Sequence, residues 1–217
     1  MGEKEGASQP PAESSCSPAD ASSPAARQDE RLALARIAAR GDARATRHLL
    51  EMVTPRVLGA IRAVMGPGHP DADDACQLAL IGFVQALPQF RGECDPTQFA
   101  ARIGVRVATA TRKRAHTLGA RTDLSRKPEE IQVTPDGLAA ARRRTLVRSL
   151  VDALPEEQGE TLALRVVLGW SLKEISAASG APVNTIRSRL RLAKDALRKR
   201  IVSDPDMLDA LDLGEDP

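Results

Sequence analysis

The chain has 217 residues and a formal net charge of +2, with 31 Lys and Arg against 29 Asp and Glu. Hydrophobic residues make up 42% of it and aromatic residues only 2%, which disfavours a β-sandwich or barrel and predicts a core of Leu, Val, Ile and Ala. Its three Cys have neither disulfide nor zinc-site spacing, and no apolar run is long enough for membrane insertion. The amino terminus also lacks a signal-peptide profile, so we expect a cytoplasmic, all-α protein.

The composition along the chain predicts two small helical domains between two polar ends. Residues 1–28 lack Leu, Ile, Val and Phe and are expected to be a disordered extension, because they cannot bury enough apolar surface to offset the entropy of ordering. Apolar periodicity marks residues 29–115 and 138–201 as helical blocks, and the polar segment 116–137, which contains two prolines, as a flexible linker. Residues 202–217 form an acidic tail.

Residues 71–90 are predicted to form a helix. Asp73 and Asp74 lie near its start, where carboxylates interact favourably with the helix dipole. These acids, with His69 and Asp71, could also be imagined as a divalent-metal site, but neither a calcium-loop pattern nor a second group of carboxylates follows, so we assign no metal. The apolar residues of this helix fall on one face: Cys76, Leu80, Phe83 and Leu87.

Residues 91–115 are predicted to form a loop and then a helix with an apolar and a basic side. The residues that share the apolar side are Phe99, Ile103, Val107 and Ala110. Between positions 101 and 127 the basic residues face a single acid, Asp123, which favours a polyanion partner despite the low net charge. The nucleic-acid contacts expected in this block are Arg102, Arg106, Arg112, Lys113 and Arg114.

The end of the second block carries the local signals of a helix-turn-helix motif. Ser171 and Glu174 have the spacing of a capping box, which begins a short helix. Gly180 then supplies a turn that tolerates a positive φ, and Pro182 suits the start of a second helix, predicted over residues 183–201.

This second helix has an apolar and a basic face. The residues expected to pack inward are Val183, Ile186, Leu190, Ala193, Leu197 and Ile201. The charges alone would also fit a solvated amphipathic helix, but the capping box, the turn and the clustered bases together favour major-groove recognition, where Arg can pair with guanine. The expected DNA contacts are Asn184, Thr185, Arg187, Ser188, Arg189, Arg191 and Lys194.

Residues 154–201 resemble region four of bacterial RNA polymerase sigma factors, in the extracytoplasmic-function (ECF) branch of the sigma-70 family. The resemblance is most specific at Leu154-Pro155, Glu174-Ile175, Gly180 and the run VNTIRSRL that begins at Val183. Ser176 and Ser179 depart from the family, which usually has Ala and a larger apolar residue at these positions. Response regulators share part of this pattern, so this block by itself does not decide the function.

The first block resembles region two of the same family. The resemblance implies that the helix at 71–90 binds core RNA polymerase, through Asp73, Asp74, Gln77 and Leu78. For residues 91–115 it implies that the loop and helix hold the separated non-template strand, with residues 91–97 bordering a pocket for a flipped base. The family usually has Trp where Phe99 stands and Asn where Arg106 stands, so the groove chemistry of this chain differs.

Together these expectations predict a sigma factor that binds core RNA polymerase and directs promoter recognition, DNA melting and transcription initiation. The implied partners are core polymerase, promoter DNA and, as for many family members, an anti-sigma factor; no cofactor is implied. The alternative is a helix-turn-helix transcriptional regulator that does not bind core polymerase, although such a regulator needs neither the helix at 71–90 nor a second basic helix. The chain shows no catalytic arrangement of Ser, His, Cys or paired carboxylates, so we do not expect an enzyme.

Overall fold

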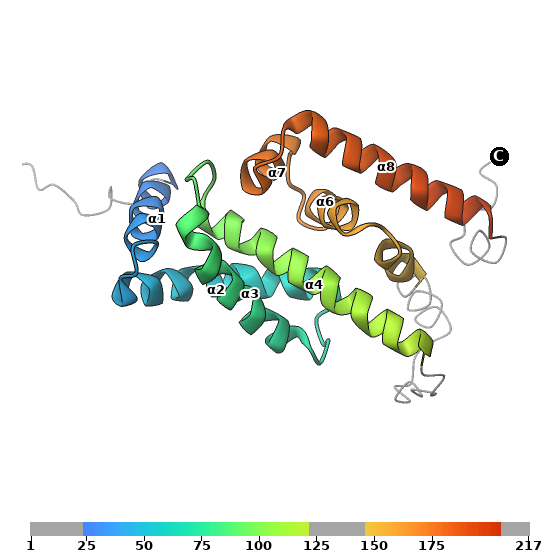
Figure 1. Cartoon of the computed structure of the whole chain (residues 1–217), viewed down its shortest axis with the longest axis horizontal. Helices are drawn as coiled ribbons and strands as arrows, with labels where there is room; N and C mark the ends of the chain where they lie inside the picture. Colours follow the sequence, from blue (N-terminus) through green and yellow to red (C-terminus); the bar gives the residue numbers. More distant parts are fainter. Residues whose placement is uncertain (1–23, 122–145, 205–217) are drawn as a thin grey trace, which may run out of the picture.

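The computed structural model describes residues 24–121 and 146–204, and within these ranges every regular element is a helix (Figure 1). The elements are α1 (Pro24–Ala38), α2 (Ala43–Met65), α3 (Ala72–Ala86), the 3-10 turn η2 (Leu87–Gln89), α4 (Pro96–Arg121), α6 (Glu156–Val166), α7 (Leu172–Ser179) and α8 (Val183–Val202). A further helical segment, residues 146–152, precedes α6. The prediction of an all-α fold is confirmed. In the described ranges, no helix combines the length and the apolar character needed to cross a membrane.

Two helices extend beyond the predicted block boundaries. α1 begins at Pro24, inside the segment 1–28 that the composition predicted to be disordered, and α4 continues to Arg121, into the predicted linker 116–137. Once a helix is anchored by packing, each added residue gains a hydrogen bond at low entropic cost, and a proline is tolerated in the first turn. The remainder of the predicted linker and residues 205–217 of the acidic tail lie outside the described residues.

The first block, defined here as α1 to α4, is built around the contact between α2 and α4. α2 begins where the Asp42 carboxylate accepts a hydrogen bond from the Ala45 N–H at 2.7 Å. Val57 and Ile61 of α2 are fully buried, and Gly104 of α4 lies against them. A Cβ at Gly104 would lie 3.2 Å from a side-chain carbon of Val57, so the absence of a side chain lets the two helices approach closely.

The apolar side predicted for α4 is only half-buried. Phe99, Ile103 and Val107 are partly exposed, whereas a stripe of mostly small residues beside them is buried in the core. That buried stripe consists of Ala100, Ala101, Gly104, Val105 and Ala108. Small side chains contribute little to a hydrophobic pattern in the sequence, yet they allow close helix packing, which explains why the pattern missed this stripe.

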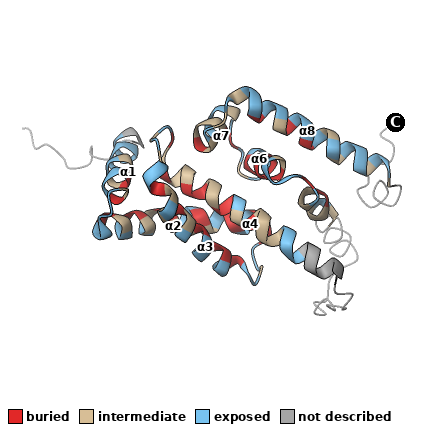
Figure 2. Cartoon of the chain, viewed as in Figure 1, coloured by how far each residue is buried: buried red, intermediate tan, exposed pale blue. Residues whose placement is uncertain are grey.

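The second block, residues 146–204, has its core where α6, α7 and α8 meet. Ile186, Leu190 and Ala193 of α8 are buried, as predicted, and contribute to the same core as Ile175 of α7 and Leu164 of α6. Figure 2 shows the opposite side of α8 exposed along much of its length. The block therefore presents one face of α8 to solvent.

The two blocks pack against each other through α4. On one side α4 contacts α2 and α3, and on the other it contacts α6 and α7 (Figure 1). The helix whose cations were predicted to bind nucleic acid is therefore the element at which the two blocks meet.

Candidate nucleic-acid interface

The helix-turn-helix has the local geometry that the sequence predicted. The Ser171 hydroxyl accepts a hydrogen bond from the Glu174 N–H at 3.2 Å, and the Glu174 carboxylate accepts one from the Ser171 N–H at 2.8 Å. The hydrogen bond from the Ser171 N–H stabilises the Glu174 carboxylate and is the main reason that the pKa of Glu174 is lowered. Gly180 ends α7 with φ of 68°, the left-handed conformation that glycine adopts without strain.

Ser176 and Ser179 give the turn between α7 and α8 polar contacts. The Ser176 hydroxyl donates a hydrogen bond to the Ala181 carbonyl oxygen at 2.7 Å, and the Ser179 hydroxyl accepts one from the Ala181 N–H at 3.3 Å. Where the family usually has apolar side chains, this chain therefore holds the turn by hydrogen bonds.

Most of the predicted contacts on α8 face solvent. Arg187 donates a hydrogen bond to the Asn184 side-chain oxygen at 2.6 Å, and both residues are exposed. Arg189 differs, since its guanidinium forms an ion pair with Glu157 of α6 at 2.6 Å and is 22% exposed. The other predicted contacts on this helix, all exposed, are Thr185, Ser188, Arg191 and Lys194.

The predicted polymerase contacts lie together on the outer side of α3. Asp73, Asp74 and Gln77 are exposed, and the Leu78 side chain is 54% exposed. Ile81, one turn further along the same helix, is 55% exposed and was not singled out by the sequence pattern. The structure thus places two large apolar side chains in solvent beside acidic groups, which is typical of a protein-binding surface.

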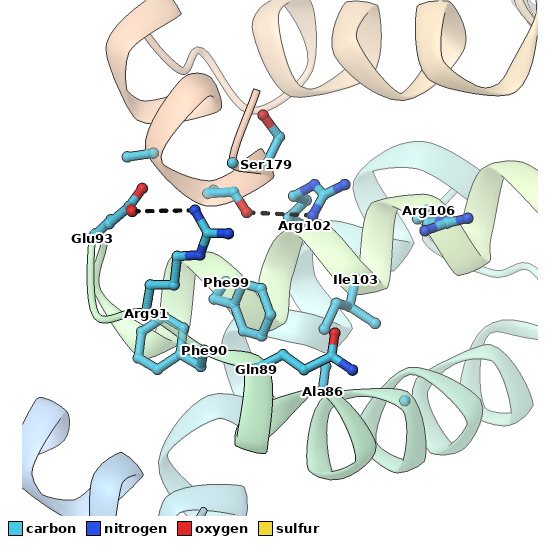
Figure 3. Close-up of a pocket in the computed structure, with 14 residues that line it drawn as sticks. Ala86, Gln89, Phe90, Arg91, Glu93, Phe99, Arg102, Ile103, Arg106 and Ser179 are labelled. Atoms are coloured by element: carbon cyan, nitrogen blue, oxygen red, sulfur yellow. Dashed lines mark hydrogen bonds and ion pairs between the residues drawn. The ribbon is translucent and has the colours of Figure 1, made fainter. Parts of the chain in front are cut away.

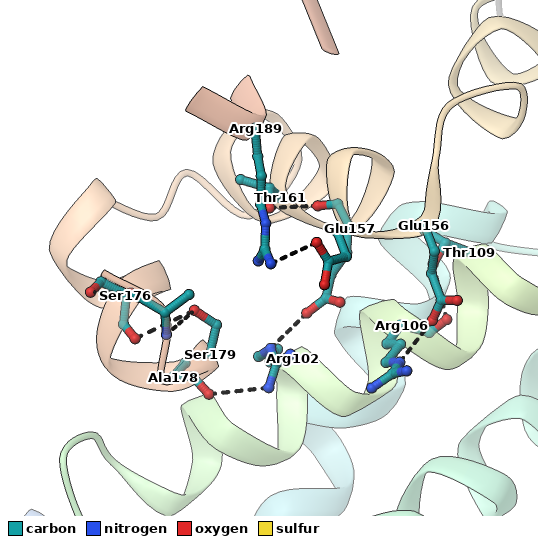
Figure 4. Close-up of polar contacts among 12 residues, drawn as sticks. Arg102, Arg106, Thr109, Glu156, Glu157, Thr161, Ser176, Ala178, Ser179 and Arg189 are labelled. Carbon is teal, nitrogen blue, oxygen red and sulfur yellow. Dashed lines mark hydrogen bonds and ion pairs between the residues drawn. The ribbon is translucent and has the colours of Figure 1, made fainter. Parts of the chain in front are cut away.

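Arg102 and Arg106 of α4 contact the second block, although the Arg106 side chain is also 58% exposed (Figure 4). The Arg102 guanidinium donates hydrogen bonds to the Glu160 carboxylate at 2.6 Å and to the Ala178 carbonyl oxygen at 3.3 Å. One turn further, Arg106 donates to Glu156 at 2.8 Å, and this hydrogen bond raises the pKa of Arg106.

Arg112 makes a third, more buried contact of the same kind. Its guanidinium donates to the Asp152 carboxylate at 2.9 Å and to the Val64 carbonyl oxygen at 3.0 Å. The Arg112 and Asp152 side chains are only 10% and 9% exposed, and burial lowers the pKa of Arg112 more than the carboxylate raises it. Lys113 donates to the Leu154 carbonyl oxygen at 3.4 Å, whereas Arg114 is exposed.

A cavity of about 530 Å³ lies between the blocks, beside Arg102 (Figure 3). The loop after η2 contributes Arg91 and Glu93, two of the residues expected to border a base pocket, and the half-buried apolar side of α4 contributes Phe99. The rings of Phe90 and Phe99 are 5.0 Å apart. Residues 177–180, at the end of α7, complete the lining from the second block.

The loop that borders this cavity is held by an ion pair with α1. Arg31 donates to both carboxylate oxygens of Asp95, with its Nε 3.0 and 3.3 Å from them. Asp95 also accepts hydrogen bonds from the Thr97 N–H and hydroxyl, each at 2.7 Å. Burial alone would raise the pKa of Asp95, but the hydrogen bonds from Arg31 and Thr97 lower it below its ordinary value. The sequence pattern did not indicate this contact.

Comparisons with known proteins decide the family. The family model described as Sigma-70 region 2 matches residues 49–117, and that described as Sigma-70, region 4 matches residues 144–197. The ECF RNA polymerase sigma factor SigD of Mycobacterium tuberculosis is 32% identical over 193 residues, which cover 82% of this chain and 88% of SigD. This chain belongs to the sigma-70 family, in its ECF branch.

Two further similarities extend over most of this sigma factor. The ECF RNA polymerase sigma-E factor of Escherichia coli K12 is 26% identical over 172 residues, covering 75% of this chain and 89% of that protein. A solved structure of CnrH in complex with the cytosolic domain of CnrY matches with a TM-score of 0.46 and 24% identity, and covers 80% of this chain and 98% of CnrH.

The chain is therefore a sigma factor, and the alternative of a regulator that does not bind core polymerase is not favoured. Core RNA polymerase and promoter DNA are the partners that membership of the family supports. Sigma factors are normally non-enzymatic initiation factors. Within the described residues, no group of three or more His, Cys, Asp or Glu is placed to hold a metal ion, and the buried Cys76 and Cys94 are free thiols.

Proposed function

We propose that this sigma factor divides its work among three helices: α3 binds core polymerase, α4 and its loop hold the melted non-template strand, and α8 reads the upstream promoter element. The exposed surface of α3 is the observation that carries the proposal. An acidic helix start followed by the half-exposed Leu78 and Ile81 suits a partner helix that offers apolar and basic groups.

For α8, the proposal rests on the exposure of its outer face. Arg187 and Arg191 lie one turn apart and both are exposed, so they can reach base edges in one major groove. Lys194 lies further along the helix, where contact with phosphate is expected.

For strand capture, the proposal rests on the cavity and on the cations beside it. Phe90 and Phe99 offer aromatic faces for an unstacked base, and Arg102 and Arg106 stand at the same cavity to hold the backbone. We assign Arg112, Lys113 and Arg114 to the continuation of this backbone path along α4.

Membership of the family supports two further expectations, which complete the proposal. Since core polymerase and promoter DNA are cytoplasmic in bacteria, we place the protein in the cytoplasm. An anti-sigma factor is the remaining expected partner, and its binding would be detected as loss of core-polymerase binding when it is added.

The docking helix can be tested with a paired substitution, Gln77→Arg with Leu78→Glu, which places new charges in the proposed contact. We expect it to abolish binding to purified bacterial core polymerase. The matched control, Gln28→Arg with Ile37→Glu, introduces the same two charges at exposed positions of α1 and should bind like wild type. If wild type fails to bind core polymerase but binds duplex DNA in a salt-sensitive way, the protein acts as a conventional helix-turn-helix regulator.

A further inference from the structure

The loop before α4, residues 91–95, which we call the pocket loop, borders both the proposed base cavity and α1 (Figure 1). Arg91 and Glu93 of this loop line the cavity. The loop enters α4 at Asp95, whose backbone carbonyl oxygen accepts a hydrogen bond from the Phe99 N–H at 3.0 Å. Because the Phe99 ring lines the same cavity, the position of Asp95 affects both the loop and the ring that a captured base would meet.

α1 contacts the pocket loop with two neighbouring side chains. The Arg31 guanidinium donates to both carboxylate oxygens of Asp95, a paired contact that fixes geometry as well as distance, and the two side chains are 24% and 13% exposed. The Leu32 side chain lies against Gly92, since a Cβ at Gly92 would be 3.8 Å from Cδ2 of Leu32. Gly92 has φ of 76°, in the left-handed region that favours glycine. α1 therefore contacts the loop near its start and at its end.

We infer that Arg31 and Leu32 of α1 are positioning residues for strand capture: they hold the pocket loop in the arrangement that receives a flipped base. Neither side chain lines the cavity, so both act through the loop and not by touching DNA. A loop that is ordered before binding loses less conformational entropy when the base enters, which raises the affinity for the base. This inference rests on the proposed role of α4 and its loop in strand capture.

The two positioning residues lie outside the segment that identifies region 2. α1 spans Pro24–Ala38, whereas the match to the family model of region 2 begins at residue 49. The contact between α1 and the pocket loop is therefore not among the features by which the family model recognises this chain.

The contact can be removed without detaching α1 from the first block. Ala35 and Ala38 of α1 are buried in the core, so the helix has its own anchor. Among the described residues, the other ion pair of the pocket loop joins Arg91 to Glu93 at 3.9 Å, within the loop itself (Figure 3). Its side chains are 77% and 52% exposed, and an exposed pair contributes little. Arg31 is therefore the charged restraint that ties the loop to another helix.

The test removes the guanidinium and compares the result with the loss of a matched charge. Arg31→Gln keeps a polar side chain but loses the ion pair, and the control Arg36→Gln makes the same change at an exposed position of the same helix. Arg31→Lys keeps the positive charge but not the planar fork that pairs with both carboxylate oxygens. Each full-length variant is assembled with core polymerase before DNA binding is measured.

The probe is a short fluorescent oligonucleotide with the non-template sequence of a promoter that the wild-type holoenzyme opens. A series in which each nucleotide in turn is abasic locates the position whose base adds most to wild-type affinity. The intact oligonucleotide is then compared with the one that is abasic at this position, because the difference between them isolates base capture from backbone binding.

We expect Arg31→Gln to bind the intact oligonucleotide on the order of tenfold more weakly than the control, and to bind the abasic one equally well. Arg31→Lys should fall between the two. A merely structural role would weaken binding of both oligonucleotides to the same extent. Such an equal loss, or an unchanged affinity of Arg31→Gln for the intact oligonucleotide, would overturn the inference.

A second variant covers the case in which Arg31→Gln is poorly folded. Leu32→Ala removes the apolar contact with Gly92 and leaves every charge in place. It should weaken binding of the intact oligonucleotide by a smaller factor and leave the abasic one unchanged. No loss in a Leu32→Ala variant that melts like wild type would then count against α1 as the element that positions the loop, and would overturn the inference.

The wild-type holoenzyme separates this inference from the proposed function. If wild type does not bind core polymerase or opens no promoter, the proposed function fails whatever the variants do. If it opens a promoter but no abasic position weakens its binding, base capture fails as proposed. If wild type shows a base-dependent affinity that Arg31→Gln retains in full, only the inference fails.

Discussion

α4 and α8 both carry rows of basic residues, but the two rows differ in how far their side chains are exposed to solvent. On α8, Arg187, Arg191 and Lys194 face solvent, whereas Arg189 forms an ion pair with Glu157 of its own block. On α4, Arg102 and Arg112 are largely covered by acids of the other block. A row of cations in a sequence thus indicates which residues favour a polyanion, but not whether they are accessible. Accessibility is a property of the tertiary arrangement.

The largest expected effect on stability is the loss of a buried cation, compared with the loss of an exposed one. Arg112→Ala removes the hydrogen bonds that the guanidinium donates to the buried Asp152 carboxylate and to the Val64 carbonyl oxygen, so we expect the free energy of unfolding to fall by about 1.5–3 kcal/mol. Arg191→Ala, on the exposed face of α8, should change it by less than about 0.5 kcal/mol. Thermal or urea denaturation followed by circular dichroism measures both. Equal stability of the two variants would mean that the ion pair between Arg112 and Asp152 contributes nothing to the stability of the fold.

The exposed cations of α8 can be tested by their effect on DNA binding. Arg187→Ala or Arg191→Ala should weaken binding to the specific upstream element by about 1–3 kcal/mol if each contacts a base, whereas Lys194→Ala should weaken specific and random DNA alike. Electrophoretic mobility or fluorescence anisotropy gives the affinity for each DNA type, and hence the ratio of specific to random binding. Equal losses on both DNA types would remove Arg187 and Arg191 as readers of sequence.

The ion pair between Arg31 and Asp95 tests how much the loop before α4 contributes to the stability of the first block. Asp95→Asn weakens the ion pair with Arg31 and should lower the free energy of unfolding by about 1.5 kcal/mol at neutral pH. Because the pKa of Asp95 is lowered in the folded state, its contribution is present above the unfolded pKa and is lost as the pH falls through the folded value. The difference from wild type should therefore shrink in acid. A pH-independent difference would assign the effect to packing.

The smallest effect concerns the turn of the helix-turn-helix. Ser176→Ala removes the hydrogen bond to the Ala181 carbonyl oxygen and should cost about 1 kcal/mol or less of unfolding free energy. Thr46→Ala, which removes an exposed side-chain hydrogen bond near the start of α2, is a control outside the second block. A stabilised Ser176→Ala variant would show that apolar packing is the better solution at this turn.

The sequence predicted the second block well because its signals are local. The capping box of Ser171 and Glu174, the positive φ at Gly180 and the inward face of α8 each depend on residues close together in the chain. Such features follow from short-range hydrogen bonding and helical periodicity.

The contacts that the sequence did not predict join distant residues. Arg31 and Asp95 are 64 positions apart, and Arg102 and Glu160 are 58 apart, so no spacing rule relates them. The buried stripe of α4 was missed for a different reason. Ala100, Ala101 and Ala108 carry a weak hydrophobic signal, yet their size is what lets α4 pack against its neighbours.

The matched spacing of the two ion pairs between α4 and α6 has an evolutionary consequence. Because Arg102 and Arg106 are proposed to hold the melted strand and also donate to these glutamates, a change at either arginine alters both DNA binding and the contact between the two blocks. Glu156 and Glu160 have no proposed contact with DNA, so a change at either affects the contact between the two blocks alone. Selection could therefore adjust how tightly the two blocks pack by changing these glutamates, while the promoters that the protein recognises stay the same.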